Sequence, residues 1–471
     1  MLLITLLWSC LQAVQPVIKP GPNFGDTLVV VRSVNLYGNI RTRDRIILRE
    51  MAVRSGDTLR QGDLAGKLAW DQRKITNTNL FITVDVVAKP VVDTTAGIQL
   101  VDIEVNMKER WYLFALPTFD LADRNFNEWW YERGRDLRRT IYGGRLSYRN
   151  VTGVGDRLAL ILEFGFTRRT VLSYSRPYID RAQRTGLRID FSYATNRDVP
   201  YRSAADKWLY VRSNNLLRER AFAAVILTRR NGFYHFHQLD TRFFQNSIAD
   251  TVARLNPDYF LNGRTRQRYL QLSYVYTYDR RDAVAYPLQG TWLRLIATQM
   301  GVLPNDDIHQ TELLGSFTRF WLLGGRFYAN SGVRAKYSWP ERQPYFNLRG
   351  LGTLDNFARG YELYVVDGQQ YTLWRNNLKY QLFTVRKQLK WVPVRQFSTL
   401  PLAAYINVFA DAGYVGSTVA RQYESRLANT WLLGTGVSLD VVTFYNLVGR
   451  FSFSINRQGQ TGFFVNILQE I

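Results

Sequence analysis

Asp411 is the side chain whose surroundings most strongly demand a chemical partner. It lies near the end of a segment, residues 402–413, in which apolar and polar side chains alternate with the period of a β-strand. The apolar set is Leu402, Ala404, Ile406 and Val408, so the opposite face carries Tyr405, Asn407, Phe409 and Asp411. If the apolar face meets lipid, the carboxylate must point away from it, because a charge in lipid is very costly. An inward carboxylate needs a cationic partner, and an arginine can bind it through paired hydrogen bonds.

Residues 339–370 form the longest stretch in the second half of the chain without a clean strand pattern. Apolar side chains recur through it, so we expect an ordered segment, and long ordered loops in compact domains are usually functional. The strand pattern resumes on both sides. We therefore predict a loop that folds into the middle of a β-barrel, with Arg359-Gly360-Tyr361 at its tip.

Histidine chemistry is the main enzymatic alternative, and the chain has only three histidines. His235 and His237 lie two apart on one face of an expected strand, but no obvious third ligand accompanies them, whereas metal sites need three or four. We expect them to be solvated histidines of the barrel interior. His309 is expected in a loop. No neighbourhood suggests a Ser–His–Asp arrangement, so we predict a protein that is not an enzyme and holds no metal and no cofactor.

The charge and the composition narrow the class of partner. The formal net charge is +22, and aromatic residues make up 14% of the chain. The basic residues are scattered singly among aromatics instead of forming the clustered patch typical of nucleic-acid binding. Scattered arginines favour a charged barrel interior or an anionic lipid surface, and amphipathic Trp and Tyr fit a membrane interface. We therefore expect no nucleic-acid partner.

Residues 1–13 have the short apolar run of a secretory signal peptide, although the usual basic residue in front is missing. Cys10 is the only cysteine and lies in this run, so no disulfide framework is expected. Residues 7–10 loosely resemble a lipoprotein acceptor, to which Trp8 fits poorly. Later in the chain no window has ~20 consecutive apolar residues, as a membrane-spanning helix would need. If the chain crosses a membrane, it must do so as a barrel.

Residues 26–108 read as one small α/β unit with the order β-α-α-β-β. The expected strands are residues 28–36, 80–87 and 98–107, and the expected helices are residues 42–51 and 58–77. Thr58 and Gln61 have the spacing of a capping box at the start of the second helix. Glycines end elements where positive φ is favourable. The joints of the unit are Gly38, Asn39, Gly56, Asp57 and Phe81.

Residues 109–471 read as strand after strand, which predicts a mostly β protein. Segments of about ten residues with one polar and one apolar face are the signature of a transmembrane β-barrel. About sixteen such segments occur, an even number as in bacterial barrels. The sixth is the least certain, because residues 207–229 could hold one long strand or a strand with an extension. The segments start near residues 111, 141, 157, 170, 186, 220, 233, 268, 290, 309, 326, 371, 402, 430, 446 and 462.

The small unit followed by the barrel resembles the BamA/TamA superfamily of outer-membrane assembly proteins, which includes the transporters of two-partner secretion. The unit is similar to that family's POTRA domain. The tripeptide Arg359-Gly360-Tyr361 matches the tip of the family's inward-folded sixth extracellular loop, here residues 340–370, and Phe409-x-Asp411-x-Gly413 matches its motif on the thirteenth strand. The resemblance implies that Arg359 pairs with Asp411. Relatives often have an acid on the twelfth strand where Asn377 stands here.

The resemblance also implies a function and a location. It predicts an outer-membrane protein of a Gram-negative bacterium, with the POTRA-like domain in the periplasm and a barrel that opens sideways between its first and last strands. Expected partners are unfolded outer-membrane or secreted client proteins, periplasmic or lipoprotein partners, and outer-membrane lipid. A secretion pore of the two-partner type, or a passive porin or receptor barrel, remains an alternative.

Overall fold

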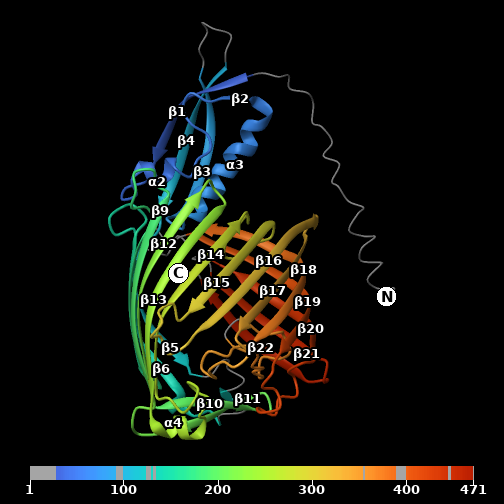
Figure 1. Ribbon diagram of the computed structural model, residues 1–471. Helices are drawn as coiled ribbons and strands as arrows, with labels where there is room; N and C mark the ends of the chain where they lie inside the picture. The colour runs from blue at the N-terminus through green and yellow to red at the C-terminus, as the bar shows by residue number, and fades with distance from the viewer. Residues whose placement is uncertain are drawn as a thin grey trace.

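A small N-terminal domain stands on one end of a β-barrel (Figure 1). The computed structural model describes residues 28–91, 99–122, 129–130, 134–353, 356–388, 399–443 and 447–469. The expected signal peptide, with Cys10, lies outside the described residues. Among the residues that are described, no helix is long and apolar enough to span a membrane.

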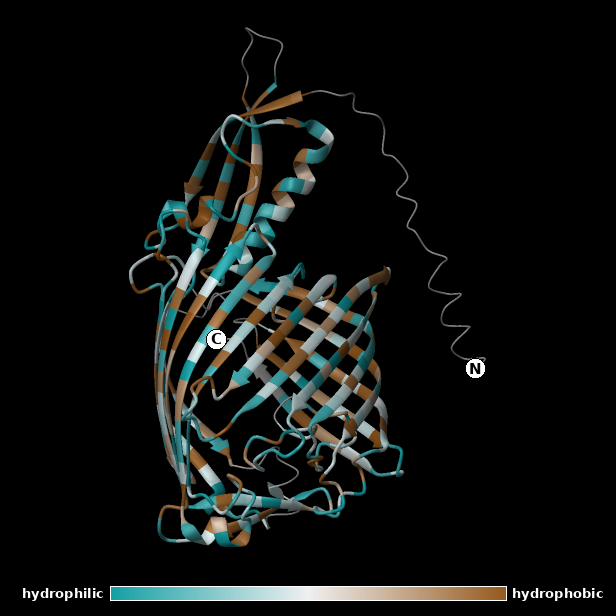
Figure 2. Ribbon diagram, in the orientation of Figure 1, coloured by the Kyte–Doolittle hydropathy of each residue, from teal (hydrophilic) through white to brown (hydrophobic). Residues whose placement is uncertain are grey.

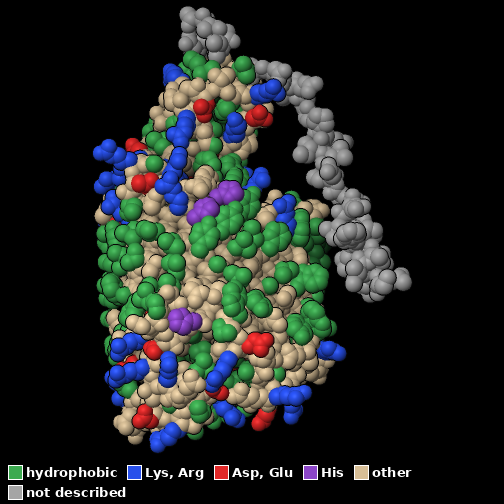
Figure 3. Space-filling view, in the orientation of Figure 1, with side chains coloured by type: hydrophobic (Ala, Val, Ile, Leu, Met, Phe, Trp, Pro, Cys, Tyr) green, Lys and Arg blue, Asp and Glu red, His purple; other side chains and the backbone are tan. Residues whose placement is uncertain are grey.

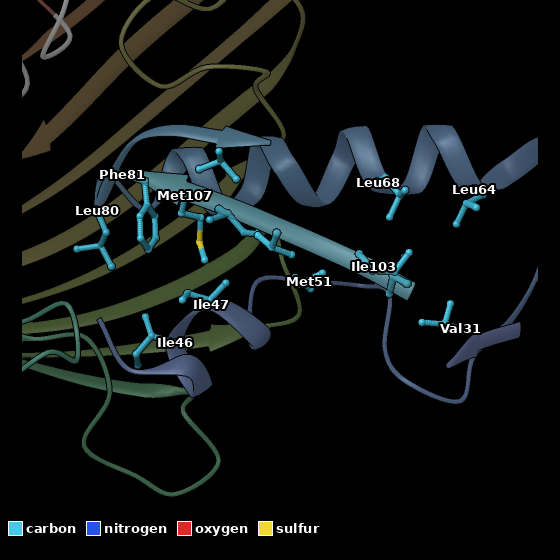
Figure 4. Packing of buried hydrophobic residues seen from close by; sticks show 14 of the residues in the cluster. Val31, Ile46, Ile47, Met51, Leu64, Leu68, Leu80, Phe81, Ile103 and Met107 are labelled. Carbon is cyan, nitrogen blue, oxygen red and sulfur yellow. The ribbon is translucent and has the colours of Figure 1, made fainter. Parts of the chain in front are cut away.

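The small domain packs two helices against a four-stranded sheet of order β2-β1-β4-β3. Its core is apolar, and Figure 4 shows Leu64 and Leu68 of the long helix lying over Ile103 of the sheet. The short helix contributes Ile46 and Ile47, which are both buried. Strands β1 and β4 are parallel, and the other two pairs are antiparallel. The elements are β1 (Leu28–Tyr37), α2 (Asp44–Leu48), β2 (Thr58–Arg60), α3 (Gln61–Asn77), β3 (Phe81–Val91) and β4 (Gln99–Glu109).

The predicted capping box is wrong. Thr58 belongs to β2 and pairs with Val30 of β1, so the order is β-α-β-α-β-β. Helix α3 starts at Gln61, and its N-cap residue Arg60 makes no side-chain cap hydrogen bond. As an extended strand, residues 58–60 pair with β1 at the edge of the sheet, which an additional helical turn could not do.

The residues expected at the joints lie where elements end. Gly38 has φ +88°, and a Cβ there would come within 1.9 Å of the Met107 carbonyl oxygen, so only glycine fits. Gly56 has φ +91° in the turn before β2. Asn39 donates its side-chain amide to the carbonyl of Thr42, and Asp57 accepts from the backbone of Arg54. The ring of Phe81 is buried in the domain core.

The barrel wall is one antiparallel sheet of 16 strands, which confirms the predicted fold class. Apolar and polar residues alternate along its strands (Figure 2). The two terminal strands of the sheet are β5 and β22. Its strands are β5 (Leu113–Leu121), β6 (Thr140–Arg149), β7 (Arg157–Gly165), β8 (Thr167–Arg176), β9 (Thr185–Asn196), β12 (Arg218–Asn231), β13 (His235–Ile248), β14 (Arg266–Asp279), β15 (Gly290–Met300), β16 (Gln310–Gly324), β17 (Phe327–Trp339), β18 (Gln370–Gln388), β19 (Thr399–Gly416), β20 (Trp431–Val442), β21 (Leu447–Asn456) and β22 (Thr461–Gln469).

The uncertain sixth segment divides into a loop hairpin and a barrel strand. β10 (Asp198–Ala204) and β11 (Lys207–Arg212) form a separate two-stranded sheet, and β12 follows as the sixth strand of the wall. Ala205 and Asp206 join the hairpin with φ of +47° and +62°. Positive φ at both central residues suits the tight turn of a twisted hairpin.

Two histidines lie on the opposite face from the one expected. His235 and His237 share a face of β13 with the exposed Leu239 and Phe243, so they lie on the outside of the barrel and not in its interior. The inward face of the same strand carries the buried Asp240. The alternation was therefore predicted correctly, but the histidines were assigned to the wrong face.

Loops cover the end of the barrel that lies away from the small domain (Figure 1). Here the β10–β11 hairpin and helix α4 (Asp250–Leu255) pack with residues 340–348 and 419–423 around one apolar cluster. Tyr259, Tyr345 and Leu348 are almost completely buried in it. We call this cluster and its loops the cap.

The small domain is docked on the barrel through a buried ion pair. The guanidinium of Arg230 on β12 donates to both carboxylate oxygens of Glu50, at 2.5 and 2.7 Å. Both side chains are less than a tenth exposed. The hydroxyl of Tyr178, in the turn after β8, lies 3.3 Å from the same carboxylate. Val154, from the turn after β6, completes the contact by joining the apolar core of the small domain.

Candidate functional site

The candidate site is the loop between β17 and β18, which are the eleventh and twelfth strands of the wall. Its first part belongs to the cap, and residues 356–364 turn inward to lie against β18–β21. We call residues 356–364 the loop tip. An antiparallel bridge between Leu351 and Val366 holds the base of the tip together.

The structure places Arg359 of the tip directly against Asp411 of β19, the thirteenth strand. Arg359 Nε donates to Asp411 Oδ2 at 2.8 Å and Nη2 donates to Oδ1 at 2.5 Å. The backbone N–H of Arg359 adds a third hydrogen bond to the same carboxylate, at 3.0 Å. The two side chains are 8% and 0% exposed, so both charges are removed from solvent and compensate each other.

The remaining contacts of Arg359 fix the plane of its guanidinium. The ring of Phe409 lies 3.8 Å from the guanidinium carbon, which is a cation–π contact. Asn377 of β18 accepts from Nη1 at 2.7 Å, so the residue that stands in the place of the family's acid still contacts the arginine. The carbonyl of Asn376 lies 3.4 Å from Nη2.

Gly360 and Tyr361 continue the tip toward β20, β21 and the turn after β21. Gly360 has φ +95°, and its carbonyl accepts from the side chain of Asn456 at 2.9 Å. Tyr361 is 2% exposed and donates its hydroxyl to Gln458 at 2.8 Å. Gly413, the last residue of the strand motif, lies under the loop, where a Cβ would come within 3.0 Å of the side chain of Leu351. The structure therefore brings all six candidate residues of the loop and the strand motif into one region.

Gly434 on β20 also receives the tip, and sequence reasoning did not find it. A Cβ at this position would lie 1.8 Å from the carbonyl oxygen of Arg359. A glycine inside a strand often marks the close approach of another backbone, so the sequence held a weak signal. Glu362 was also missed. Its carboxylate accepts from the N–H of Gly360 at 2.7 Å and stabilises the turn of the tip.

A cavity of about 410 Å³ lies beside the tip in the barrel interior. Its polar lining is mainly cationic, and in the described parts of the chain no three His, Cys, Asp or Glu side chains gather as metal ligands. The cavity is therefore a polar space whose charge is mainly positive. Its charged lining residues are Arg334, Arg359, Glu362, Arg375, Lys379 and Arg450.

The wall has two ends beside this site. Across the described residues, the hydrogen-bonded ladder runs from β5 to β22, and these two strands are not neighbours in it. Strand β5 contains Pro117, which has no N–H to donate and is typical of an edge strand. We call the boundary between β5 and β22 the seam.

Comparisons with known proteins agree with this architecture. Residues 150–368 match the Omp85 superfamily domain. The structure of BamA from Haemophilus ducreyi lacking POTRA domains 1–3 is similar, with a TM-score of 0.52 and 17% identity over 93% of this chain and 84% of that chain. CdiB from Escherichia coli is similar with a TM-score of 0.55 and 12% identity, over 93% of this chain and 75% of that chain. At such identities the likeness shows the fold alone. A comparison with curated protein sequences gave no match.

Proposed function

We propose that this chain, whose residues 150–368 match the Omp85 superfamily domain, inserts or translocates client proteins at the outer membrane of a Gram-negative bacterium. The clients are unfolded outer-membrane or secreted proteins. The observation that carries the proposal is the seam, because a wall with two ladder ends can offer a strand edge to an incoming chain. Strand exchange and membrane burial supply the free energy, so no nucleotide is needed.

The Arg359–Asp411 pair acts in this proposal as a latch that holds the loop tip inside the barrel. The tip contacts four consecutive strands, β18–β21, which lead up to β22. A fixed tip keeps this side of the seam in register while the seam opens. Breaking a buried pair by removing one partner costs about 3–5 kcal/mol, which is enough to determine whether the tip stays in place.

The small domain acts as a POTRA domain on the periplasmic side and receives extended client segments. Its sheet has β2 and β3 at its edges, and β3 is the longer edge, with 11 residues. An extended peptide can add to such an edge through main-chain hydrogen bonds. Lys89 and Pro90 on β3 are residues that protect edges from uncontrolled pairing. Periplasmic or lipoprotein partners would use the same exposed surfaces.

Disulfide crosslinking of the seam tests the proposal. Cysteines are placed in pairs along residues 113–119 of β5 and 462–466 of β22, in a variant without Cys10. We expect crosslinked protein to lose client assembly and to recover it after reduction. A matched control joins Val437 to Phe453, which face each other across β20 and β21 and do not separate in this mechanism. Client assembly that persists with a fully crosslinked seam would refute lateral opening.

Conductance separates this proposal from the alternatives. A passive porin needs an open passage, whereas here the cap covers one end and the loop tip occupies the interior. We expect low conductance in a planar bilayer and a large increase for Arg359→Ala. A large, steady conductance of the unmutated protein would favour the porin. Secretion of one dedicated partner, with no effect on membrane protein assembly, would favour the two-partner pore.

A further inference from the structure

A continuous ladder of aromatic rings runs from helix α3 of the small domain onto the outer face of the barrel. It starts where Trp70 lies 5.7 Å from Tyr234, measured between ring centroids, and continues from Tyr234 to Tyr278 at 6.2 Å. Tyr278 contacts His235 at 5.1 Å. The ladder then alternates between β13 and β14. Its members in order are Trp70, Tyr234, Tyr278, His235, Tyr276, His237 and Tyr274.

Hydrogen bonds fix the lower part of the ladder. His235 Nδ1 lies 2.8 Å from the hydroxyl of Tyr276, and His237 Nδ1 lies 2.7 Å from the hydroxyl of Tyr274. The rings are therefore held in place before any ligand arrives, and the imidazoles and hydroxyls keep hydrogen-bonding capacity for a polar group beside them.

Two exposed arginines flank the upper part of the ladder. Arg73 lies over the ring of Trp70 at 5.1 Å, and Arg280 lies over Tyr234 at 5.9 Å. Neither forms an ion pair with any described residue. Asp279, next to Arg280, is held by Arg281 at 2.6 Å. The patch thus presents two exposed arginines whose charges are not compensated by a carboxylate, beside the partly buried ammonium of Lys74, which lies 4.3 Å from the centroid of the Tyr234 ring.

The patch borders the apolar outer band of the barrel. Below the histidines, the same face exposes Leu239, Phe243 and Leu272. Figure 3 shows the two neighbouring histidine side chains at this border, with apolar side chains of the barrel beneath them. Aromatic rings and basic groups at the edge of an apolar band are the arrangement found at the headgroup level of a membrane.

We propose that this patch binds the phosphate of an anionic glycerophospholipid in the leaflet on the side of the small domain. The arginines attract the phosphodiester, the Tyr and His groups hydrogen-bond to it, and the acyl chains lie along Leu239 and Leu272. Because Trp70 and Arg73 belong to α3, the bound lipid would also tie the small domain to the membrane surface. The inference rests on the proposed membrane location of the barrel.

Lipid retention on the full chain tests the proposal. The protein is reconstituted in nanodiscs of phosphatidylcholine with added phosphatidylglycerol, and bound lipids are identified by native mass spectrometry after release. We expect a preference for phosphatidylglycerol that falls about 5-fold for each arginine lost, in Arg73→Gln and Arg280→Gln. The matched control, Arg264→Gln with Arg342→Gln, removes the same charge from exposed loops at the capped end.

Each outcome is decisive for the patch. Preference lost in the protein that carries both Arg73→Gln and Arg280→Gln, and kept in the control, supports the site. Equal preference in all proteins, or equal loss in variant and control, overturns it. Failure of the unmutated protein to enter nanodiscs would instead refute the membrane location on which the proposed function depends. Heat-modifiable migration in gels verifies that each variant barrel is folded.

Discussion

Replacing Asp411 by alanine tests the latch most directly. The substitution removes the carboxylate that accepts three hydrogen bonds from Arg359 and leaves the guanidinium charge buried. Removing one partner of a buried pair costs about 3–5 kcal/mol. We expect a cost near the lower end of this range, because the guanidinium keeps its hydrogen bond to Asn377 at 2.7 Å and its contact with the ring of Phe409. A loss of about 3 kcal/mol corresponds to a roughly hundredfold greater population of released tip.

Hydrogen exchange of the tip amides measures this population. The N–H groups of Arg359, Gly360 and Tyr361 are all hydrogen-bonded in the latched tip. In the Asp411→Ala variant their exchange should accelerate by about two orders of magnitude, while amides of the β12–β13 ladder keep their rates. Client assembly should fall in parallel.

A second ion pair, in which the carboxylate is buried and the arginine is partly exposed, supplies the control. Asp240→Ala removes an interior carboxylate that binds Arg242 at 2.8 Å through both oxygens, but it lies on β13 and makes no described contact with the tip. It should leave tip exchange unchanged. Adding Asn377→Asp to Asp411→Ala places a carboxylate on the other side of the Arg359 guanidinium and should restore much of the protection. Unchanged tip exchange in Asp411→Ala would show that the pair does not hold the loop.

Further variants probe the tip seat, the domain contact and one buried lysine. Gly434→Ala should displace the tip and cost about 1–3 kcal/mol of stability, because its Cβ would lie 1.8 Å from the tip backbone. Gly449→Ala is the control, because a Cβ there meets only a side chain at 3.9 Å. Thermal melting compares the two variants. Glu50→Gln should weaken the docking of the small domain on the barrel by about 3 kcal/mol, and adding Arg230→Gln should recover part of this loss. Spin-label distances between the domain and the barrel report how far the domain has loosened. Burial, and next the charge of Arg230, lowers the pKa of Lys74 to about 8 from 10.5. Between pH 8 and pH 10.5 the unfolded chain therefore binds more protons than the folded chain, so the free energy of unfolding should rise with pH across this window. Lys74→Met should remove about 1–2 kcal/mol of that rise after allowance for solvent screening. Denaturant unfolding at the two ends of the window measures it.

The strand pattern was readable from sequence because each barrel strand faces two different environments. Every expected strand start falls within three residues of the observed one. The same alternation placed Asn377 and Asp411 on the inward face, where the structure has them. The alternation showed only that Asp411 needs a cationic partner, and the resemblance to the BamA/TamA superfamily implied that this partner is Arg359.

What sequence reasoning missed depended on contacts between distant segments. The register of β1 with residues 58–60 decides that Thr58 is extended, and no local signal competes with its helix-start pattern. The close approach at Gly434 exists only after the loop has folded inward. The outward position of His235 could have been found, because Asp240 and Arg242 on the same strand require the inward face and leave the histidines on the other.

The contacts of the loop tip also divide the wall into two mechanical halves. The tip contacts described above fall on β18–β21 and the turn that follows, so the loop acts as a splint on the C-terminal arc. The small domain, by contrast, rests on Arg230 of β12 and on the turns after β6 and β8. Because the C-terminal arc is stiff, bending of the wall is concentrated in the N-terminal arc on the other side of the seam. This N-terminal arc carries the small domain. Tilting of the domain would then work as a lever on the compliant side of the wall.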